Sequence, residues 1–273
     1  MRAQRLIPSL IALTACLVLR TTALASEPFV IVSDIDDTVK ISHSTKPSAA
    51  LYDGFFGKKA FAGMAELYQA WVTHTGLTNH LGDRALVFLS AGPTFLHDTL
   101  WNQLVTLNHF PPAGFVLRPW QVMPDIAQYK ALALERLAAH YPHPLILLGD
   151  DTEHDPEVLP AFAAAHPGKV LAVWIKRNLN RALPEGDHGF YNAFDLALGE
   201  LEAGRLDAAD VLTVGERILA NQDPELLFPS FYYCPAIEYP QVPSGPVEQA
   251  HPEVQDMRRR VESRVLDVCS AKN

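Results

Sequence analysis

Apolar runs and helical patterns alternate along the first two thirds of the chain. Short apolar runs predict strands at 29–32, 85–89, 114–117, 145–148 and 170–175. Apolar residues with helical spacing predict helices at 61–73, 94–107, 126–140 and 156–166. Short strands separated by helices of about ten residues or more indicate β-α-β crossovers. The predicted fold class is therefore α/β, with a Rossmann-like parallel sheet flanked by helices.

The last third of the chain has a weaker pattern. Helices are predicted at 191–201 and 208–220. The stretch 224–246 carries six prolines together with aromatic residues, which favours an irregular segment that wraps the protein. A final helix is predicted at 252–268, and we expect its run of three arginines, 258–260, to be a solvated helix face.

The first 25 residues have the layout of a secretory signal peptide. Two arginines precede an apolar run of 14 residues, and Ala23-Leu24-Ala25, with a small residue at each end, closes the segment. This run is shorter than the roughly 20 residues of a membrane-spanning helix. We expect cleavage after Ala25 and a periplasmic or secreted protein. The alternative is a lipoprotein attached through Cys16, because residues 13–16 resemble a lipidation box, although apolar residues continue beyond the cysteine.

Removal of this segment takes away three arginines and no acids. The mature chain then has 19 basic and 31 acidic residues and a formal charge of −12, compared with −9 for the full sequence. This balance argues against nucleic acid as a partner, because phosphate backbones bind clustered lysine and arginine. The negative charge is compatible with a phosphorylated substrate, because a divalent cation and a few nearby basic residues dominate the electrostatic potential inside a binding site.

Two cysteines remain in the mature chain, Cys234 and Cys269. In an exported protein such a pair predicts a disulfide. It would close a loop of about 35 residues and stabilise the fold by roughly 3 to 4 kcal/mol in the chain-entropy picture. Two buried free thiols are the alternative.

Polar residues that can carry chemistry follow the predicted strands. Asp34 and Asp36 come directly after the first strand, and ligands of α/β sheets bind at the carboxyl ends of strands. One carboxylate of such a pair can attack a substrate while the other moves a proton. Ser90 ends the second strand, and Lys130 lies on a predicted helix. Taken alone, Ser90 is also compatible with a helix cap, and Lys130 with a solvated helix residue.

A second acidic cluster follows the fourth strand and includes Asp150 and Asp155. Paired carboxylates, a hydroxyl, an ammonium and further acids at one sheet edge suit phosphoryl transfer assisted by a metal. Oxygen ligands without histidine pairs or cysteines favour Mg²⁺ over Zn²⁺. The neighbouring Asp151 and Glu153 are equally compatible with surface acids.

The order of these residues resembles the haloacid dehalogenase superfamily of aspartate-nucleophile phosphatases. Within it, segments 32–40, 110–120 and 149–157 are similar to the catalytic domain of the actin-patch-protein type phosphatidate phosphatases, which are related to the lipins. The likeness covers about residues 29–180. It implies a haloacid dehalogenase fold with a small cap or none. The expected parts are a signal peptide at 1–25, a catalytic domain at 26–185 and a C-terminal helical and irregular extension at 186–273 that packs on it.

The resemblance also implies roles for individual residues. Asp34 would attack phosphorus and form an aspartyl-phosphate, and Asp36 would protonate the leaving group and then activate water. Ser90 would hold a phosphoryl oxygen, and Lys130 would stabilise the developing charge. Thr38 would orient the loop.

The metal ligands implied by the resemblance come from both acidic segments. Mg²⁺ would lie between the carboxylate of Asp34, the backbone carbonyl of Asp36 and the carboxylate of Asp150. Asp155 would complete or support this shell. The sequence thus predicts a Mg²⁺-dependent phosphatase.

The substrate is the most open question. About fifty residues separate the first two motifs, too few for a large lid, and an open site favours a lipid phosphate such as phosphatidate. Lys40, His43 and Lys46, with the aromatic and lysine residues at 52–59, suggest a peripheral membrane contact, or else the aromatics pack under a short cap. The alternatives are an exported phosphatase for soluble phosphomonoesters and a non-catalytic phospholipid-binding domain; the presence of both Asp34 and Asp36 argues against the latter.

Overall fold

The computed structural model describes most of the chain after residue 26. The described residues are 27–43, 57–77, 84–119, 125–184, 187–235, 239–240 and 242–272. The predicted signal peptide, with Ala25 and Cys16, lies outside these ranges, and so do Lys46 and the aromatic residues at 52–56.

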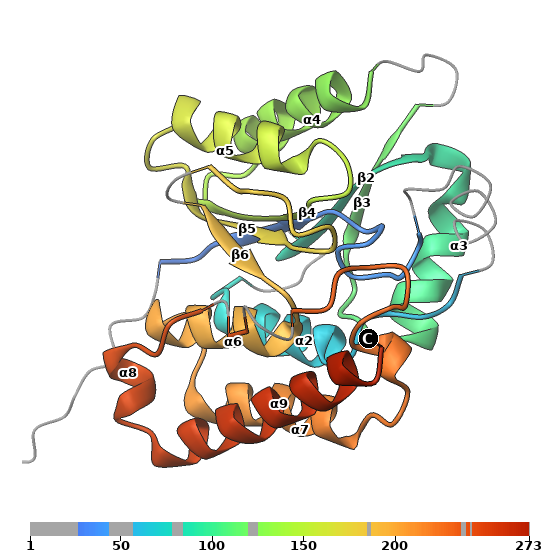
Figure 1. The fold of residues 1–273 in the computed structure, drawn as a ribbon. Helices are drawn as coiled ribbons and strands as arrows, with labels where there is room; N and C mark the ends of the chain where they lie inside the picture. The colour runs from blue at the N-terminus through green and yellow to red at the C-terminus, as the bar shows by residue number, and fades with distance from the viewer. Residues whose placement is uncertain are drawn as a thin grey trace, which may run out of the picture.

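The centre of the fold is a six-stranded sheet in the order β3-β2-β1-β4-β5-β6, in which every neighbouring pair is parallel (Figure 1). Its strands are β1 (Val30–Ser33), β2 (Leu86–Pro93), β3 (Gly114–Arg118), β4 (Leu145–Asp150), β5 (Val170–Lys176) and β6 (His188–Phe190). The α/β fold class and the five predicted strands are confirmed. The sixth strand escaped prediction because its three residues are fewer than the four to eight that a strand pattern needs.

The helices also follow the sequence pattern closely. They are α2 (Met64–His74), α3 (His97–Trp101), α4 (Ile126–His140), α5 (Asp155–Ala165), α6 (Ala193–Glu202), α7 (Ala208–Ala220), α8 (Pro246–Gln249) and α9 (Pro252–Ser270), with short helical turns η1 (Thr94–Leu96), η2 (Asn102–Leu107) and η3 (Pro224–Leu226). The single helix predicted at 94–107 is divided into η1, α3 and η2. Helix α2 begins three residues later than predicted, after Gly63, whose φ of 83° is unfavourable for other residues.

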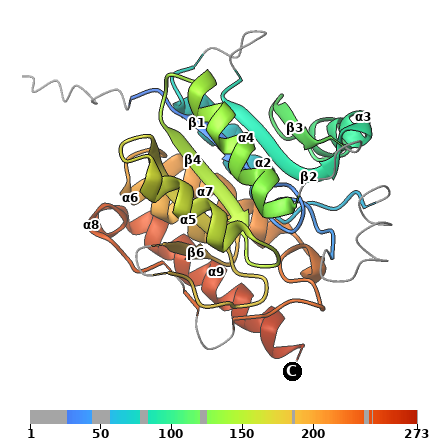
Figure 2. The same cartoon turned by 90° about the horizontal axis from the view of Figure 1, so that it is seen from above.

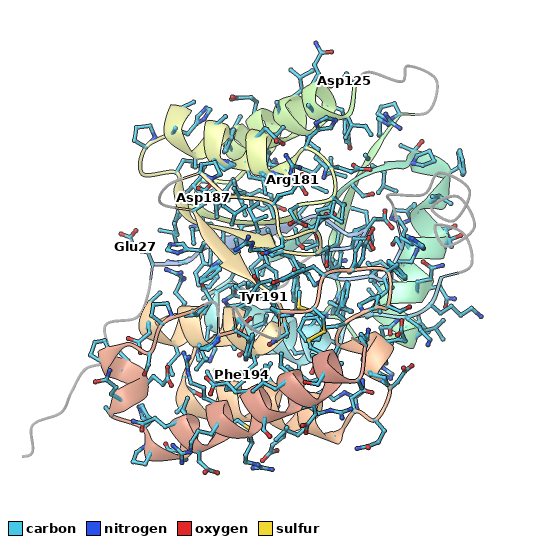
Figure 3. All side chains as sticks on the ribbon, in the orientation of Figure 1. Glu27, Asp125, Arg181, Asp187, Tyr191 and Phe194 are labelled. Carbon is cyan, nitrogen blue, oxygen red and sulfur yellow. A yellow bond between two sulfur atoms is a disulfide. The ribbon has the colours of Figure 1, made fainter. Side chains whose placement is uncertain are left out.

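The helices form layers on both faces of the sheet. Helices α4 and α5 cover one face, whereas α2 and α6 cover the other, with α7 and α9 packed outside them (Figures 1 and 2). Successive side chains of β1 point to opposite faces, as in any strand. Val30 and Val32 therefore belong to the core under α4 and α5, whereas Phe29 and Ile31 belong to the core on the other side. Side chains fill the space between these layers (Figure 3).

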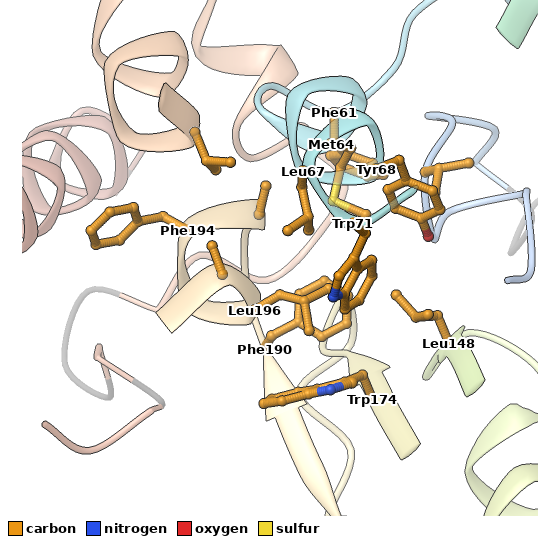
Figure 4. Close-up of a cluster of buried hydrophobic side chains, with 14 of the residues drawn as sticks. Phe61, Met64, Leu67, Tyr68, Trp71, Leu148, Trp174, Phe190, Phe194 and Leu196 are labelled. Carbon is orange, nitrogen blue, oxygen red and sulfur yellow. The ribbon is translucent and has the colours of Figure 1, made fainter. Parts of the chain in front are cut away.

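The larger core is rich in aromatic residues. Trp71 of α2 lies close to Trp174 of β5 and Phe190 of β6 in this cluster, and Tyr68 packs beside Trp71 (Figure 4). Both indole N–H groups donate to one buried carboxylate, that of Glu200 on α6, over 3.0 Å from Trp71 and 2.8 Å from Trp174. Two N–H groups of Arg205 also donate to it, each over 2.6 Å. Glu200 thus satisfies the polar groups of an otherwise apolar layer.

The C-terminal segment wraps the helical layer and is closed by a disulfide. Cys234 and Cys269 are bonded, with an S–S distance of 2.02 Å and a Cα–Cα distance of 5.4 Å. The described residues of 224–246 are mainly irregular, as predicted. The prediction of a wholly solvated arginine run was wrong for Arg258, which is buried and pairs with Glu248 over 2.7 Å, because α8 and residue 242 cover that side of α9.

The division at residue 185 into a catalytic domain and an extension stays a prediction. In the structure β6, which lies beyond that boundary, is part of the same sheet, and helices α6, α7 and α9 share one core with β1 and β2. Among the described residues, no helix combines the length and the apolar character needed to cross a membrane.

Replacing Glu200 with alanine should strongly destabilise the fold. The change leaves two buried indole N–H groups and the guanidinium of Arg205, whose side chain is 15% exposed, without their acceptor; the loss of one partner from a buried ion pair costs about 3 to 5 kcal/mol. Urea unfolding followed by tryptophan fluorescence measures the difference. The exposed Glu216→Ala change on α7 is the control and should stay within about 0.5 kcal/mol of the unchanged protein. Equal effects of the two changes would contradict this account of Glu200.

Candidate active site

The predicted site residues gather at the point where the strand order of the sheet reverses. Strands β1 and β4 are neighbours, and from them the chain builds outward to β2 and β3 on one side and to β5 and β6 on the other. A crevice at such a switch point is the usual binding place of open α/β sheets. The acidic segments 34–38 and 150–155 directly follow these two central strands. The topology therefore explains why two segments over 100 residues apart meet.

Asp34 points toward the α4 and α5 side because it shares a strand face with Val30 and Val32. There its Oδ1 accepts a hydrogen bond of 2.9 Å from Nζ of Lys130, which α4 places over the carboxyl end of the sheet. Both side chains are buried. Lys130 is thus part of the site and is not a solvated residue of the helix.

Asp155, the first residue of α5, is the second partner of this lysine. Its Oδ1 accepts from Nζ of Lys130 over 2.6 Å, and its Oδ2 accepts from the backbone N–H of Asp150 over 3.3 Å. The close approach depends on Gly149, because a Cβ added there would lie only 2.4 Å from Oδ2 of Asp155. A side chain at position 149 would thus clash with Asp155, which explains the glycine before the second acidic segment.

Asp150 completes the buried cluster. The hydroxyl of Thr38 lies 3.2 Å from its Oδ2 and 3.1 Å from Oδ2 of Asp34, so the threonine bridges the two acidic segments. The backbone N–H of Thr152 donates to Oδ1 of Asp150 over 2.6 Å. These contacts fix the orientation of both carboxylates.

Asp36 lies apart from the buried cluster and is more open to solvent, with a side chain 33% exposed. Its Oδ2 lies 3.5 Å from the hydroxyl of Ser90, and its Oδ1 accepts from the hydroxyl of Ser42 over 2.5 Å. The ammonium of Lys40 is 3.9 Å from the same Oδ1. Lys40 is buried, which corrects the suggestion that it takes part in an exposed membrane contact.

Ser90 is held in place by the irregular end of β2. The pairing of β2 with β3 shifts between Ser90 and Pro93. The backbone N–H of Gly92 donates to the serine hydroxyl over 2.9 Å. This turn directs the hydroxyl of Ser90 toward the partly exposed side chain of Asp36.

The cluster has an excess of negative charge. One ammonium, that of Lys130, faces the carboxyl groups of Asp34, Asp150 and Asp155, above a floor of apolar side chains from β1, β2, β4 and α5. Burial raises the pKa of Asp34 well above its usual value, in opposition to Lys130, and the neighbouring acids add to the rise. Burial and the nearby Asp155 raise the pKa of Asp150 in the same way. Burial alone would lower the pKa of Lys130, but the carboxylates of Asp155 and Asp34 raise it well above its usual value.

This excess charge fits a bound cation. Asp34, Asp150 and Asp155 each offer a carboxylate oxygen, and these oxygens lie within 4.8 Å of one another. The site can therefore hold a metal ion, and a donor set made of oxygen alone suits a hard divalent cation. The side chain of Asp36 is not in this group, and the role of its backbone carbonyl as a ligand stays a prediction.

Two residues that the sequence pattern had not marked, Lys176 and Asn178, also belong to the site region. Lys176 ends β5 beside Asp150, and burial lowers the pKa of its ammonium to about 8 although nearby carboxylates oppose the change. Its Nζ donates to Oδ1 of Asn178, whose Nδ2 donates to the backbone carbonyl of Asp37 over 2.7 Å. The rule that found the other residues, polar groups at strand ends, would have found Lys176 as well.

Asp151 has a structural task. It is buried, and its carboxylate accepts the backbone N–H groups of Leu179 and Arg181 over 2.8 and 2.9 Å. It is therefore neither a surface acid nor a member of the carboxylate cluster, and it anchors the loop that follows β5. The backbone carbonyl of Glu153 accepts from the same arginine over 2.7 Å.

The fold and site define a class of protein: a Rossmann-like α/β protein with the aspartate, serine, lysine and aspartate motifs of the haloacid dehalogenase superfamily in sequence order. Residues 29–177 match the family described as "Phosphatidate phosphatase APP1, catalytic domain". This match spans more than half of the chain, and the chain belongs to that family. The resemblance inferred from the motifs is confirmed.

A curated relative agrees with this assignment. The chain is 26% identical over 155 residues to the protein "Phosphatidate phosphatase APP1" of Saccharomyces cerevisiae. The matched region covers 54% of this chain and 25% of the yeast protein. The chain thus corresponds to about a quarter of that relative's length.

The carboxylate cluster should make the stability of the protein depend on pH, and Mg²⁺ should cancel this dependence. Because the pKa values of Asp34 and Asp150 are raised in the folded state above 3.8, these groups favour folding at low pH, and that contribution is lost as pH rises through their raised values. In EDTA the free energy of unfolding should therefore fall from pH 4 toward neutrality. Added Mg²⁺ should restore it by binding the ionised carboxylates of the folded state.

Urea unfolding at pH 4 to 8 with EDTA or Mg²⁺ measures this effect. The variant Asp150→Asn should show a smaller fall with pH and a weaker response to Mg²⁺. Identical pH profiles with and without the metal would show that the cluster binds no Mg²⁺.

Proposed function

We propose that this protein is a Mg²⁺-dependent phosphomonoester hydrolase that acts through an aspartyl-phosphate, with phosphatidate or a related lipid phosphate as its substrate. The observation that carries the proposal is the position of Asp34, a buried carboxylate at the switch point of the sheet, held between Lys130 and two further acids. Residues 29–177 match a family that is described as the catalytic domain of a phosphatidate phosphatase, and this match favours a phosphorylated lipid as the substrate.

Asp34 is oriented for nucleophilic attack. Lys130 binds Oδ1 and Thr38 binds Oδ2, so the carboxylate cannot rotate freely. An oxygen of Asp34 forms a bond to phosphorus while the bond from phosphorus to the ester oxygen breaks. Mg²⁺ held by Asp34, Asp150 and Asp155 would neutralise charge on the phosphoryl oxygens, which lets an anionic nucleophile approach an anionic ester.

Asp36 is suited to move the protons. Its partial exposure gives it access to water, and its contact with Ser90 places it at the mouth of the site. Asp36 donates a proton to the leaving alkoxide in the first step. In the second step it accepts a proton from a water molecule that attacks phosphorus and releases Asp34, so the protein returns to its starting state. The hydroxyl of Ser90 holds a phosphoryl oxygen and Lys130 stabilises the charge on the others.

A peripheral membrane contact is part of this proposal. Phe95, just beyond the carboxyl end of β2, is 58% exposed. Phe231 is 37% exposed and stacks on His43, the last residue of the loop 34–43, which we call the catalytic loop. The side chains of Lys58 and Lys59 are also exposed on the segment that follows the first motif. Exposed aromatic and lysine side chains suit the interface of an anionic membrane.

We also propose that the protein works in the periplasm or outside the cell. The signal-peptide pattern at 1–25 is one support. The Cys234–Cys269 disulfide is a second one, because disulfides persist in oxidising compartments.

Phosphate release by residues 26–273 tests the function. The substrates are phosphatidate in mixed micelles, p-nitrophenyl phosphate and nucleotides, each with Mg²⁺ or EDTA. We expect metal-dependent release, mainly from phosphatidate. Release mainly from the soluble esters would support the phosphatase mechanism but contradict a lipid phosphate as the substrate. Binding to phosphatidate vesicles with no release from any ester would support a non-catalytic lipid-binding domain.

Replacing Asp34 with asparagine should reduce turnover to the level of a blank without unfolding the protein. The amide keeps the shape of the side chain but is no nucleophile, and the cluster loses one negative charge, so the melting temperature in EDTA should be unchanged or higher. Phosphate release and circular dichroism measure the two effects. Asp98→Asn, the same change at a fully exposed aspartate, is the control; activity near that of the control would overturn the nucleophile assignment.

Replacing Asp36 with asparagine should slow the reaction by about 10²- to 10⁴-fold, the usual worth of general acid–base catalysis. The loss should be smaller for p-nitrophenyl phosphate than for an alkyl phosphate, because a phenolate of low pKa leaves without a proton. Steady-state rates on both esters measure the difference. Equal losses on the two substrates would contradict the role of Asp36 as general acid.

A further inference from the structure

The matched family region ends at residue 177, and the residues directly beyond it contact the catalytic loop. Asn178 follows β5, is buried, and donates from Nδ2 to the backbone carbonyl of Asp37 over 2.7 Å. Asp37 has a φ of 60°, a left-handed conformation that is uncommon for residues other than glycine. The amide thus binds the loop at its sharpest turn, one residue after Asp36.

Lys176 sets which way the Asn178 amide faces. A lysine ammonium has donors only, so the atom of the amide that contacts it must be the acceptor, Oδ1. The NH₂ group of the amide is then directed at the carbonyl of Asp37. Lys176 itself is held by burial and by the ring of Phe61, whose centroid is 3.5 Å from Nζ. The orientation of the amide is therefore determined by a side chain that has little freedom to move.

The turn at Asp37 in turn supports Asp36. The carboxylate of Asp37 accepts the backbone N–H groups of Ser42 and His43 over 2.8 and 3.0 Å. Its own N–H donates to the carbonyl of Lys40 over 2.7 Å. Ser42, fixed in this way, donates its hydroxyl to Oδ1 of Asp36. A displacement of Asp37 would thus move the partners of Asp36 as well as its backbone.

The C-terminal segment holds this arrangement from outside. The backbone N–H of Tyr233 donates to the carbonyl of Asn178 over 2.8 Å. Phe231 stacks on His43 with ring centroids 3.7 Å apart and planes at 8°. The next residue after Tyr233 is Cys234, whose disulfide to Cys269 ties the segment to α9. One contact of this segment therefore reaches the loop that carries Asp36 directly, at His43, and the other reaches it through Asn178.

We propose that Asn178 is a positioning residue for Asp36, and that the disulfide-tied segment 229–235 is the brace that holds Asn178 and the catalytic loop in place. Closing the disulfide thereby aligns the proton-transfer group, so the activity of the site depends on an oxidising environment. The activity part of this inference rests on the proposed hydrolase function, whereas the brace itself does not.

The variant Asn178→Asp tests the positioning role. Aspartate keeps an acceptor for Lys176 but presents an oxygen, in place of an NH₂ group, to the carbonyl of Asp37. The control is Asn192→Asp, the same change at a buried amide that caps α6 and donates from Nδ2 to the hydroxyl of Tyr239 over 3.1 Å. Hydrogen exchange of residues 34–43, followed by mass spectrometry, reports the loop directly.

We expect faster exchange of residues 34–43 in Asn178→Asp and unchanged exchange there in Asn192→Asp. The kcat for phosphomonoester hydrolysis should fall roughly 10- to 100-fold, as for a misplaced catalytic group, while KM changes by less than about twofold. A purely structural role would alter both variants alike. Unchanged loop exchange in Asn178→Asp would overturn the positioning role.

The double variant Cys234→Ser with Cys269→Ser tests the brace. We expect faster exchange of residues 34–43 and a lower kcat, and the same changes in the unchanged protein after reduction with dithiothreitol. The double variant should not respond to the reductant. Loop exchange equal to that of the oxidised protein, in either the variant or the reduced protein, would overturn the brace. If the protein releases no phosphate from any ester, the proposed function fails, and the exchange data still decide this inference.

Discussion

The arrangement of the site depends on one electrostatic constraint: the buried ammonium of Lys130 faces three buried carboxyl groups. Lys130 binds Asp34 and Asp155 directly, and Asp150 lies against the same group. Burial, and next to it the neighbouring acids, raises the pKa values of Asp34 and Asp150, so it is costly to ionise the whole cluster without a further cation. The same imbalance suits the proposed phosphatase, because it would attract a divalent cation and make the carboxylates respond to its binding.

The frame around the cluster must be rigid for this charge arrangement to persist. β1 is buried between two cores, so Asp34 leaves a strand that cannot shift without disturbing both faces of the sheet. On one face, α4 and α5 bring Lys130 and Asp155 to the site. On the other face, Ser33, the residue before Asp34, shares a buried hydrogen bond of 2.6 Å with Tyr68, which ties β1 to α2.

Most of the fold and the main site residues could be predicted from the sequence, for identifiable reasons. Buried parallel strands are continuous apolar runs, and the chemistry follows their ends, so Asp34, Ser90 and Asp150 were recognisable from local pattern alone. Lys130 needed the motif order, since its own helix does not distinguish it from a solvated lysine. The burial of Lys40 and Arg258 and the pairing of Asn178 with Asp37 depend on segments distant in sequence, and no local pattern encodes them.

Detection of a phosphorylated Asp34 tests the central claim most directly. The mature protein is mixed with substrate and Mg²⁺, quenched in acid within the first turnover, reduced with borohydride and mapped by mass spectrometry. Borohydride converts an acyl phosphate of aspartate to homoserine, and we predict homoserine at position 34 and unmodified aspartate at position 36. Turnover without any modified aspartate, or with homoserine at another position, would contradict the assignment of Asp34 as the group that accepts the phosphoryl group.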